Sequence, residues 1–129
     1  MAKKKVINSD KAPQPIGPYS VGVRMGKLIF TAGQIGLDPQ TGEIVPGGIE
    51  AETRQVLQNL QSILEAAGSA LELVVKTTVF LRDMSDFARM NAVYAEFFGQ
   101  DYPARSTVQV SALPKGGAVE IEAVASARR

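Results

Sequence analysis

Two residues in the last quarter of the chain carry the groups best suited to chemistry on a small anion. Arg105 opens a strand-like segment, Arg105–Val110. Its planar guanidinium could bind a carboxylate or a phosphate through two parallel hydrogen bonds. Glu120 lies in a second such segment, Val119–Ala127, where a carboxyl could act as a general acid or base. The plain alternatives are a surface arginine at a strand end and a solvated glutamate.

Strand periodicity sorts these segments into faces. Because successive side chains point to opposite sides of a strand, Arg105 and Thr107 share one face of their segment. In the last segment Glu120 and Glu122 share a face, and small apolar residues occupy the other. A carboxyl in such a place is costly to bury without a partner. Burial would raise its pKa and a nearby arginine would lower it, and the sequence leaves open which effect dominates.

Three further residues differ in type from the residues around them and are candidates for a site. Tyr19 follows Gly17-Pro18 and could serve packing or a site. Gly33, in Thr31-Ala32-Gly33-Gln34, marks either a bulge or a point where a ligand meets the backbone. Asn91 lies within the apolar stripe of a predicted helix, and is either a buried amide bonded to nearby backbone or a polar group that points into a site.

The chain contains neither cysteine nor histidine. This excludes disulfides, thiol chemistry, Ser-His and Cys-His nucleophilic pairs and the commonest metal ligand. There is also no phosphate-binding glycine loop, metal-ligand spacing or dinucleotide fingerprint, so we expect no cofactor and no metal. Acid–base chemistry near neutral pH must come from a carboxylate, a tyrosine, a lysine or an ordered water.

The elements that must position these groups fit one domain, residues 1–129, with residues 1–16 as an N-terminal tail and loop because Pro13 and Pro15 block regular structure. Apolar and β-branched patterns predict a β-β-α-β-α-β-β order. Two helices that alternate with strands favour an α+β fold, a mixed sheet with both helices on one face. The strands are expected at Tyr19–Met25, Leu28–Ile35, Leu73–Leu81, Arg105–Val110 and Val119–Ala127, and the helices at 49–67 and from Ser85 or Asp86 to Phe98.

Charge and hydropathy argue against nucleic acid and membrane as partners. The chain has 14 basic and 13 acidic residues, and five of the basic ones lie at its two ends, so the remainder carries about −4. Nucleic-acid binding needs a basic face on the fold itself. No apolar run is long enough for a membrane span, and Lys3–Lys5 precede no apolar stretch, so a cytoplasmic location is expected.

Several segments together resemble the RidA (reactive intermediate deaminase, YjgF-type) family over nearly the whole chain. They are Ile16-Gly17-Pro18-Tyr19, Thr31-Ala32-Gly33-Gln34-Ile35, Val75–Leu81, Pro103-Ala104-Arg105-Ser106-Thr107-Val108, Leu113-Pro114 and Val119-Glu120-Ile121-Glu122-Ala123. The resemblance implies a chorismate-mutase-like fold and a homotrimer whose sheets form a central barrel, with sites in clefts between subunits. Local pattern alone would pair the last two strands as a hairpin, whereas the family threads the Leu73–Leu81 strand between them.

The resemblance also implies an activity and its residues. Family site residues fall on Tyr19, Gly33, Asn91, Arg105, Thr107 and Glu120. Members with that arginine hydrolyse 2-iminopropanoate and 2-iminobutanoate to 2-keto acids and ammonia. Thr107 stands where many members have cysteine, and Ala32 where many have serine, which we expect to change substrate preference rather than abolish activity. The alternative is a non-catalytic trimeric module that binds small carboxylates.

Overall fold

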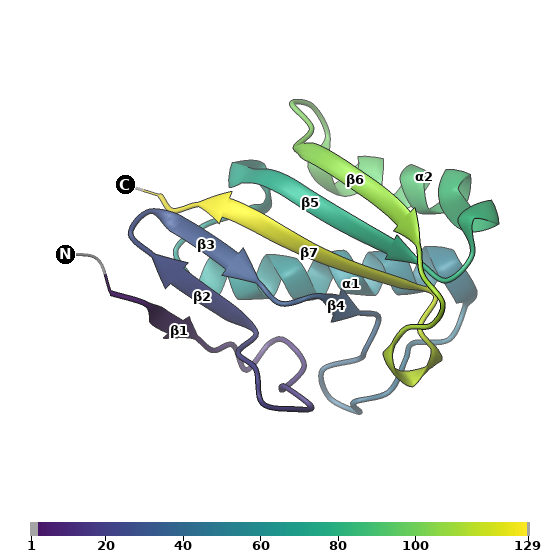
Figure 1. The fold of residues 1–129 in the computed structure, drawn as a ribbon, viewed down its shortest axis with the longest axis horizontal. Helices are drawn as coiled ribbons and strands as arrows, with labels where there is room; N and C mark the ends of the chain where they lie inside the picture. The colour runs from purple at the N-terminus through teal and green to yellow at the C-terminus, as the bar shows by residue number, and fades with distance from the viewer. Residues whose placement is uncertain (1–2, 129) are drawn as a thin grey trace.

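The computed structural model describes residues 3–128 as one mixed sheet with two helices on one of its faces (Figure 1). The sheet order is β1-β2-β3-β7-β5-β6, and β4 also pairs with β7. All pairs are antiparallel except β5 and β6, which run parallel. The strands are β1 Lys5–Ile7, β2 Gly22–Met25, β3 Leu28–Thr31, β4 Gln34–Ile35, β5 Val74–Leu81, β6 Ala104–Gln109 and β7 Val119–Ser126, and the helices are α1 Gly48–Ala66 and α2 Phe87–Phe98.

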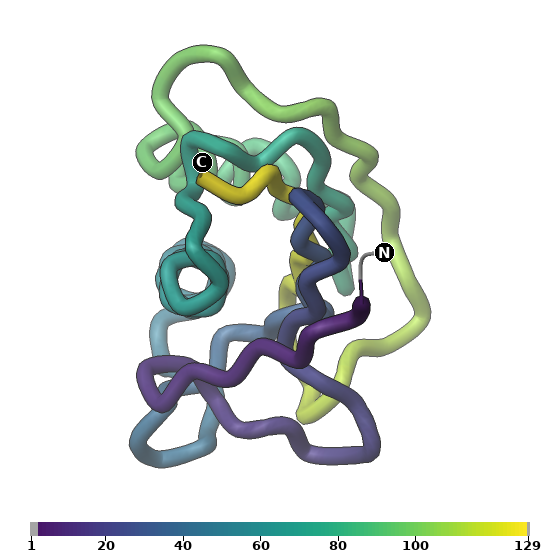
Figure 2. The backbone as a smooth tube through the Cα atoms, turned by 90° about the vertical axis from the view of Figure 1, so that its left-hand side faces the viewer, coloured from purple at the N-terminus to yellow at the C-terminus, as the bar shows by residue number. Residues whose placement is uncertain are grey.

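This architecture confirms the predicted α+β fold with both helices on one face. Figure 2 shows α1 and α2 gathered on one side of the strands. Strand β5 lies between β6 and β7, as the family resemblance implied and as a simple hairpin of the last two strands would not allow. Neither helix of residues 3–128 has the length and apolar character needed to cross a bilayer.

The helix-covered face of the sheet forms the core. Along β7 the odd-numbered residues are buried and the even-numbered ones are partly or fully exposed, which confirms the alternation read from the sequence. The stripe of α1 packs on this face because its apolar residues recur at helical spacing. Fully buried side chains include Val56, Leu57, Leu60, Ile63 and Leu64 of α1, Val79 and Leu81 of β5, and Val119 and Ile121 of β7.

The structure corrects three boundaries. Residues 5–7, predicted as part of a tail and loop, form β1, because pairing with the edge of β2 supplies backbone partners that three residues cannot supply alone. The predicted strand at Tyr19–Met25 begins only at Gly22, so Tyr19 lies in a loop. The predicted strand at Leu28–Ile35 is divided at Ala32-Gly33 into β3 and β4.

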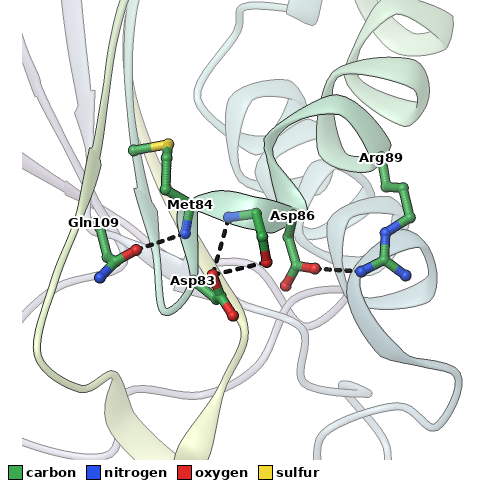
Figure 3. A network of polar contacts seen from close by, with 6 residues as sticks. Asp83, Met84, Asp86, Arg89 and Gln109 are labelled. Atoms are coloured by element: carbon green, nitrogen blue, oxygen red, sulfur yellow. Dashed lines mark hydrogen bonds and ion pairs between the residues drawn. The ribbon is translucent and has the colours of Figure 1, made fainter.

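Helix α2 begins directly after Asp86, one of the two residues predicted to cap it, although the Asp86 side chain makes no capping hydrogen bond. A short 3-10 turn, Met84–Asp86, precedes the helix, and the carboxylate of Asp83 accepts hydrogen bonds from the backbone and hydroxyl of Ser85 at 2.9 and 2.8 Å (Figure 3). The side chain of Gln109 accepts the N–H of Met84 at 2.6 Å. The end of β6 is therefore tied to the turn that starts α2.

Candidate active site

Arg105 lies on the helix-covered face of β6, at one edge of the sheet. In the parallel pair with β5 it stands beside Thr77, which is fully buried under α2. The guanidinium carbon is 4.8 Å from the ring centre of Tyr94 and 5.5 Å from that of Phe87. Cations are attracted to aromatic faces at such distances. Two rings of α2 thus hold the guanidinium.

Tyr94 is itself fixed in place. Its hydroxyl shares a 2.7 Å hydrogen bond with the hydroxyl of Thr77, and burial raises the pKa of the Tyr94 phenol. The ring therefore stays neutral and immobile beneath the guanidinium. Among residues 3–128 no carboxylate lies within ion-pair distance of Arg105. The arrangement orients a cation without neutralising it, which is what an anion-binding site requires.

A cavity of about 330 Å³ opens beside Arg105. Asn91 and Tyr102 line it, together with Tyr94, Ala95 and Pro103. The structure thus brings Asn91 and Arg105 to one cavity. The Oδ1 atom of Asn91 is buried and accepts no hydrogen bond within the described part of the chain, which contradicts the interpretation of an amide bonded to nearby backbone. Tyr102 was not predicted; its place just before the Pro103-Ala104-Arg105 segment was the available signal.

Thr107 lies two residues after Arg105 on the same face of β6, next to Val79 of β5. Its hydroxyl oxygen is buried and, like Asn91 Oδ1, has no partner among residues 3–128. Buried polar atoms are bonded in most folded proteins, so two such atoms near one guanidinium are unusual. Both are suited to a polar ligand or a further protein group.

Glu120 lies on the opposite, open face of the sheet. In the β-ladders it stands beside Phe80 of β5 and Ile35 of β4, and it is partly exposed. Desolvation raises the pKa of its carboxyl, and the like charge of Glu122 raises that pKa further. A carboxyl with a raised pKa is suited to exchange a proton near neutral pH.

Gly33 and Tyr19 complete the surroundings of Glu120. A Cβ atom on Gly33 would lie 2.7 Å from Glu120 Cδ, so any larger residue there would push the Glu120 side chain out of its place. The Tyr19 hydroxyl accepts the backbone N–H of Ile16 at 3.3 Å. All three residues line a small cavity of about 40 Å³. The absence of a side chain at Gly33 therefore leaves room for the Glu120 carboxyl.

The predicted site residues therefore form two groups within one chain. Arg105, Asn91 and Thr107 lie at the β6 edge on the helix side, and Tyr19, Gly33 and Glu120 lie around β4 and β7. Because Thr77 stands beside both Arg105 and Ala123, the ladder places Arg105 on the face opposite Glu120. One group can bind an anion and the other can move a proton.

Among residues 3–128, a mixed sheet with two helices on one face thus carries an arginine at its edge that no carboxylate neutralises and a partly exposed glutamate on its open face. Residues 9–127 match the family described as Endoribonuclease L-PSP, the YjgF/RidA family, and the chain belongs to it. The resemblance seen in the sequence is thereby confirmed.

Individual relatives are similar over almost their full length. The chain is 52% identical to 2-iminobutanoate/2-iminopropanoate deaminase of Mus musculus, over 95% of this chain and 90% of that protein. Its fold matches the crystal structure of RidA from an Antarctic Psychrobacter bacterium with a TM-score of 0.92 and 47% identity, covering 95% and 98% of the two chains. It matches E. coli TdcF with bound serine equally, with a TM-score of 0.92 and 46% identity, covering 96% and 99%.

Proposed function

We propose that this protein hydrolyses 2-imino acids, 2-iminopropanoate and 2-iminobutanoate among them, to 2-keto acids and ammonia. The main observation in favour of this proposal is the Arg105 guanidinium. Two aromatic rings orient it, and no carboxylate among residues 3–128 neutralises it. The substrate is a small anion with a C=N carbon next to its carboxylate. Relatives about half identical to this chain, which are named deaminases for these two imino acids, support the assignment.

The mechanism follows from the two groups. Arg105 binds the substrate carboxylate through two hydrogen bonds. Glu120 takes a proton from a water molecule as the water oxygen bonds to the C=N carbon, and it passes that proton to the nitrogen to give a carbinolamine. Glu120 then takes the proton of the new hydroxyl and passes it to the nitrogen as the C–N bond breaks, so that ammonia leaves and the hydroxyl oxygen becomes the keto oxygen. Tyr19, Asn91 and Thr107 shape the pocket, and the Gly33 backbone lies beside the carboxyl.

The barrier is low enough for this modest machinery. If a free imino acid survives for about ten seconds, its hydrolysis barrier is roughly 19 kcal/mol. Holding the substrate and water in a reactive geometry can supply several kcal/mol of that. Arg105 and Glu120 can therefore provide a useful acceleration through positioning and proton transfer alone.

Two copies of the chain are needed to bring the groups to one substrate. Arg105 and Glu120 project from opposite faces of a sheet, and a three- or four-carbon acid cannot reach both within one chain. We propose that the Arg105 group of one copy meets the Glu120 group of the next, in a homotrimer with the sheets around a central barrel. The site then lies in the cleft between subunits.

The open face of the sheet supports this association. It exposes large apolar side chains that a solvated face would not favour: Met25, Leu28 and Phe30 of β2 and β3, and Val108 of β6, each between 43% and 46% exposed. Met25, Leu28 and Phe30 stand on the paired strands β2 and β3, and Val108 lies across the sheet on the edge strand β6. Apolar patches of this kind mark interaction sites. A second copy of the same sheet is the occupant we propose, and a cytoplasmic location stays a prediction from the sequence.

The direct test generates the unstable substrate within the assay mixture. A dehydratase acting on threonine generates 2-iminobutanoate, and release of the keto acid is followed with and without this protein. We expect faster release with it. An unchanged rate would refute the deaminase and leave the alternative, a non-catalytic module that binds small carboxylates, which the serine complex of E. coli TdcF favours.

Replacing Glu120 distinguishes imine hydrolysis from simple binding of carboxylates. A protein that only binds an anion has no use for a second carboxylate beside it, whereas hydrolysis needs that carboxylate. We expect Glu120→Gln to lower kcat by about 10²-fold and to leave KM within a few-fold, since proton transfer is lost and the arginine remains. Steady-state kinetics in the coupled assay measure both constants. Unchanged kcat would mean that another group activates the water.

The same carboxyl sets the pH dependence. Its pKa is raised by burial and by Glu122, and only the ionised form accepts a proton from water, so wild-type activity falls as the pH drops through a value above the ordinary glutamate pKa. Glu122→Gln is the matched control: removal of the like charge moves this acidic limb to lower pH. In Glu120→Gln the residual activity should no longer fall as the pH drops through this range.

A further inference from the structure

Helix α1 buries three polar side chains, and two of them form hydrogen bonds to the backbone near β4 and β7: Glu52 and Asn59. They lie seven residues apart, two helical turns, and therefore on the same side of the helix. Glu52 is 6% exposed and Asn59 is 1% exposed. Such groups are costly in a core unless they are bonded, so their partners indicate their purpose.

Glu52 binds the backbone at the entrance to β7. Its Oε1 atom accepts the N–H of Ala118 at 2.8 Å. Ala118 lies two residues before Glu120. On its other side, Glu52 packs against Gly36 so closely that a Cβ there would come within 2.9 Å of Glu52 Cα. One turn of α1 therefore holds both the residue before β7 and the residue after β4.

Asn59 binds the backbone around β4. Its Nδ2 atom donates to the carbonyl of Leu37 at 3.0 Å and to that of Ile35 at 3.4 Å. The side chain of Gln55 donates to Asn59 Oδ1 at 2.9 Å, which fixes the orientation of the amide. Ile35 is the residue that stands beside Glu120 in the β4–β7 ladder.

We propose that Glu52 and Asn59 are positioning residues for the imine hydrolysis, which hold β4 and the start of β7 so that the Glu120 carboxyl keeps its place beside Gly33. The space there is tight, since a single added carbon at Gly33 would collide with Glu120. A small shift of either strand would therefore displace the carboxyl. Misplacement of a reacting group by about 1 Å can cost up to about 10²-fold in rate. The catalytic consequence rests on the proposed function.

Two substitutions at Glu52 separate positioning from general stability. Glu52→Leu keeps a similar volume but removes the acceptor, and Glu52→Gln keeps an acceptor oxygen. We expect Glu52→Leu to lower kcat by about 10-fold with KM within about two-fold, and Glu52→Gln to retain most of the wild-type kcat. Equal losses in both variants, or no loss in Glu52→Leu, would overturn the proposal.

Two further variants distinguish positioning from a general loss of stability, and cover the case in which Glu52→Leu does not fold. Ile63→Val trims a fully buried side chain elsewhere on α1, and is expected to lower the melting temperature without changing kcat. A drop in kcat equal to that of Glu52→Leu would count against the proposal. Asn59→Asp keeps the size and removes the donor, and should reproduce the kcat loss if Glu52→Leu does not fold; wild-type kcat there would contradict the role of Asn59.

Amide hydrogen exchange provides a readout that needs no activity. We expect the Ala118 N–H to exchange faster in Glu52→Leu than in the wild type and to stay protected in Glu52→Gln, because only the latter keeps an acceptor. Unchanged protection in Glu52→Leu would refute the anchoring while the deaminase stands. A wild type that hydrolyses no imino acid would refute the deaminase, and the exchange measurement would still decide the anchoring.

Discussion

Arg105→Ala is expected to reduce kcat/KM for 2-iminobutanoate by about 10³-fold, equivalent to about 4 kcal/mol. The guanidinium is the only group that we assign to the substrate carboxylate, and its removal leaves that charge unpaired. The fold should survive, because the side chain lies over the rings of Phe87 and Tyr94 at the sheet edge and makes no ion pair within residues 3–128. The coupled dehydratase assay measures the loss.

Arg105→Lys is the matched control for this substitution. Lysine keeps the positive charge but loses the two-point fork and the stacking of a planar group on the rings. We expect activity between those of the wild type and Arg105→Ala. Melting curves and sedimentation of all three proteins should agree. Wild-type kcat/KM in Arg105→Ala would remove the guanidinium from the mechanism.

The second large effect is expected from a charge on the open face of the sheet. Phe30 is 44% exposed and stands beside Val23 and Val124 on the neighbouring strands. Phe30→Glu would place like charges in a symmetric contact, which costs several kcal/mol. We expect the protein to sediment as a monomer and to lose nearly all imine hydrolysis, because each site then lacks half of its groups.

Gln58→Glu serves as the comparison, since it adds the same charge on the exposed side of α1. It should leave both the sedimentation coefficient and the activity unchanged. A Phe30→Glu protein that sediments as a monomer and retains wild-type activity would show that a single chain holds a complete site.

Much of this fold follows from local patterns in the sequence. Helical spacing of apolar residues predicted α1 almost to its ends, and Gly68, with a φ of 82°, follows the helix in the left-handed conformation that favours glycine. Strand β1 was missed because three residues carry too little pattern, and their pairing with β2 supplies the order. The division of β3 from β4 was signalled by Gly33, although the group that occupies the space beside Gly33, the Glu120 carboxyl, lies 87 positions further along the chain.

Periodicity could not predict whether Arg105 and Glu120 lie on the same face of the sheet or on opposite faces. A period of two assigns side chains to faces within one strand, but it does not relate the faces of two strands. That relation depends on the registers of β5 with β6 and with β7, through which Thr77 stands beside both Arg105 and Ala123. Such registers are set by tertiary packing. They divide the predicted site into two groups and lead to the proposal of a shared site.

Mixing the two impaired variants tests that proposal most directly. Arg105→Ala retains Glu120, and Glu120→Gln retains Arg105, so an oligomer that contains both variants regains an intact site where the two meet in the right order. For equal, random mixing in any closed cyclic assembly, about one quarter of all sites contain both native groups. The two proteins carry different tags and are refolded together.

We predict that the mixture recovers about one quarter of the wild-type kcat per chain, while each variant alone keeps only its low residual activity. Oligomers that carry both tags confirm that subunits have exchanged. If these mixed oligomers form and show no more activity than the separate variants, Arg105 and Glu120 do not act on one substrate across a subunit boundary, and the proposed site is contradicted.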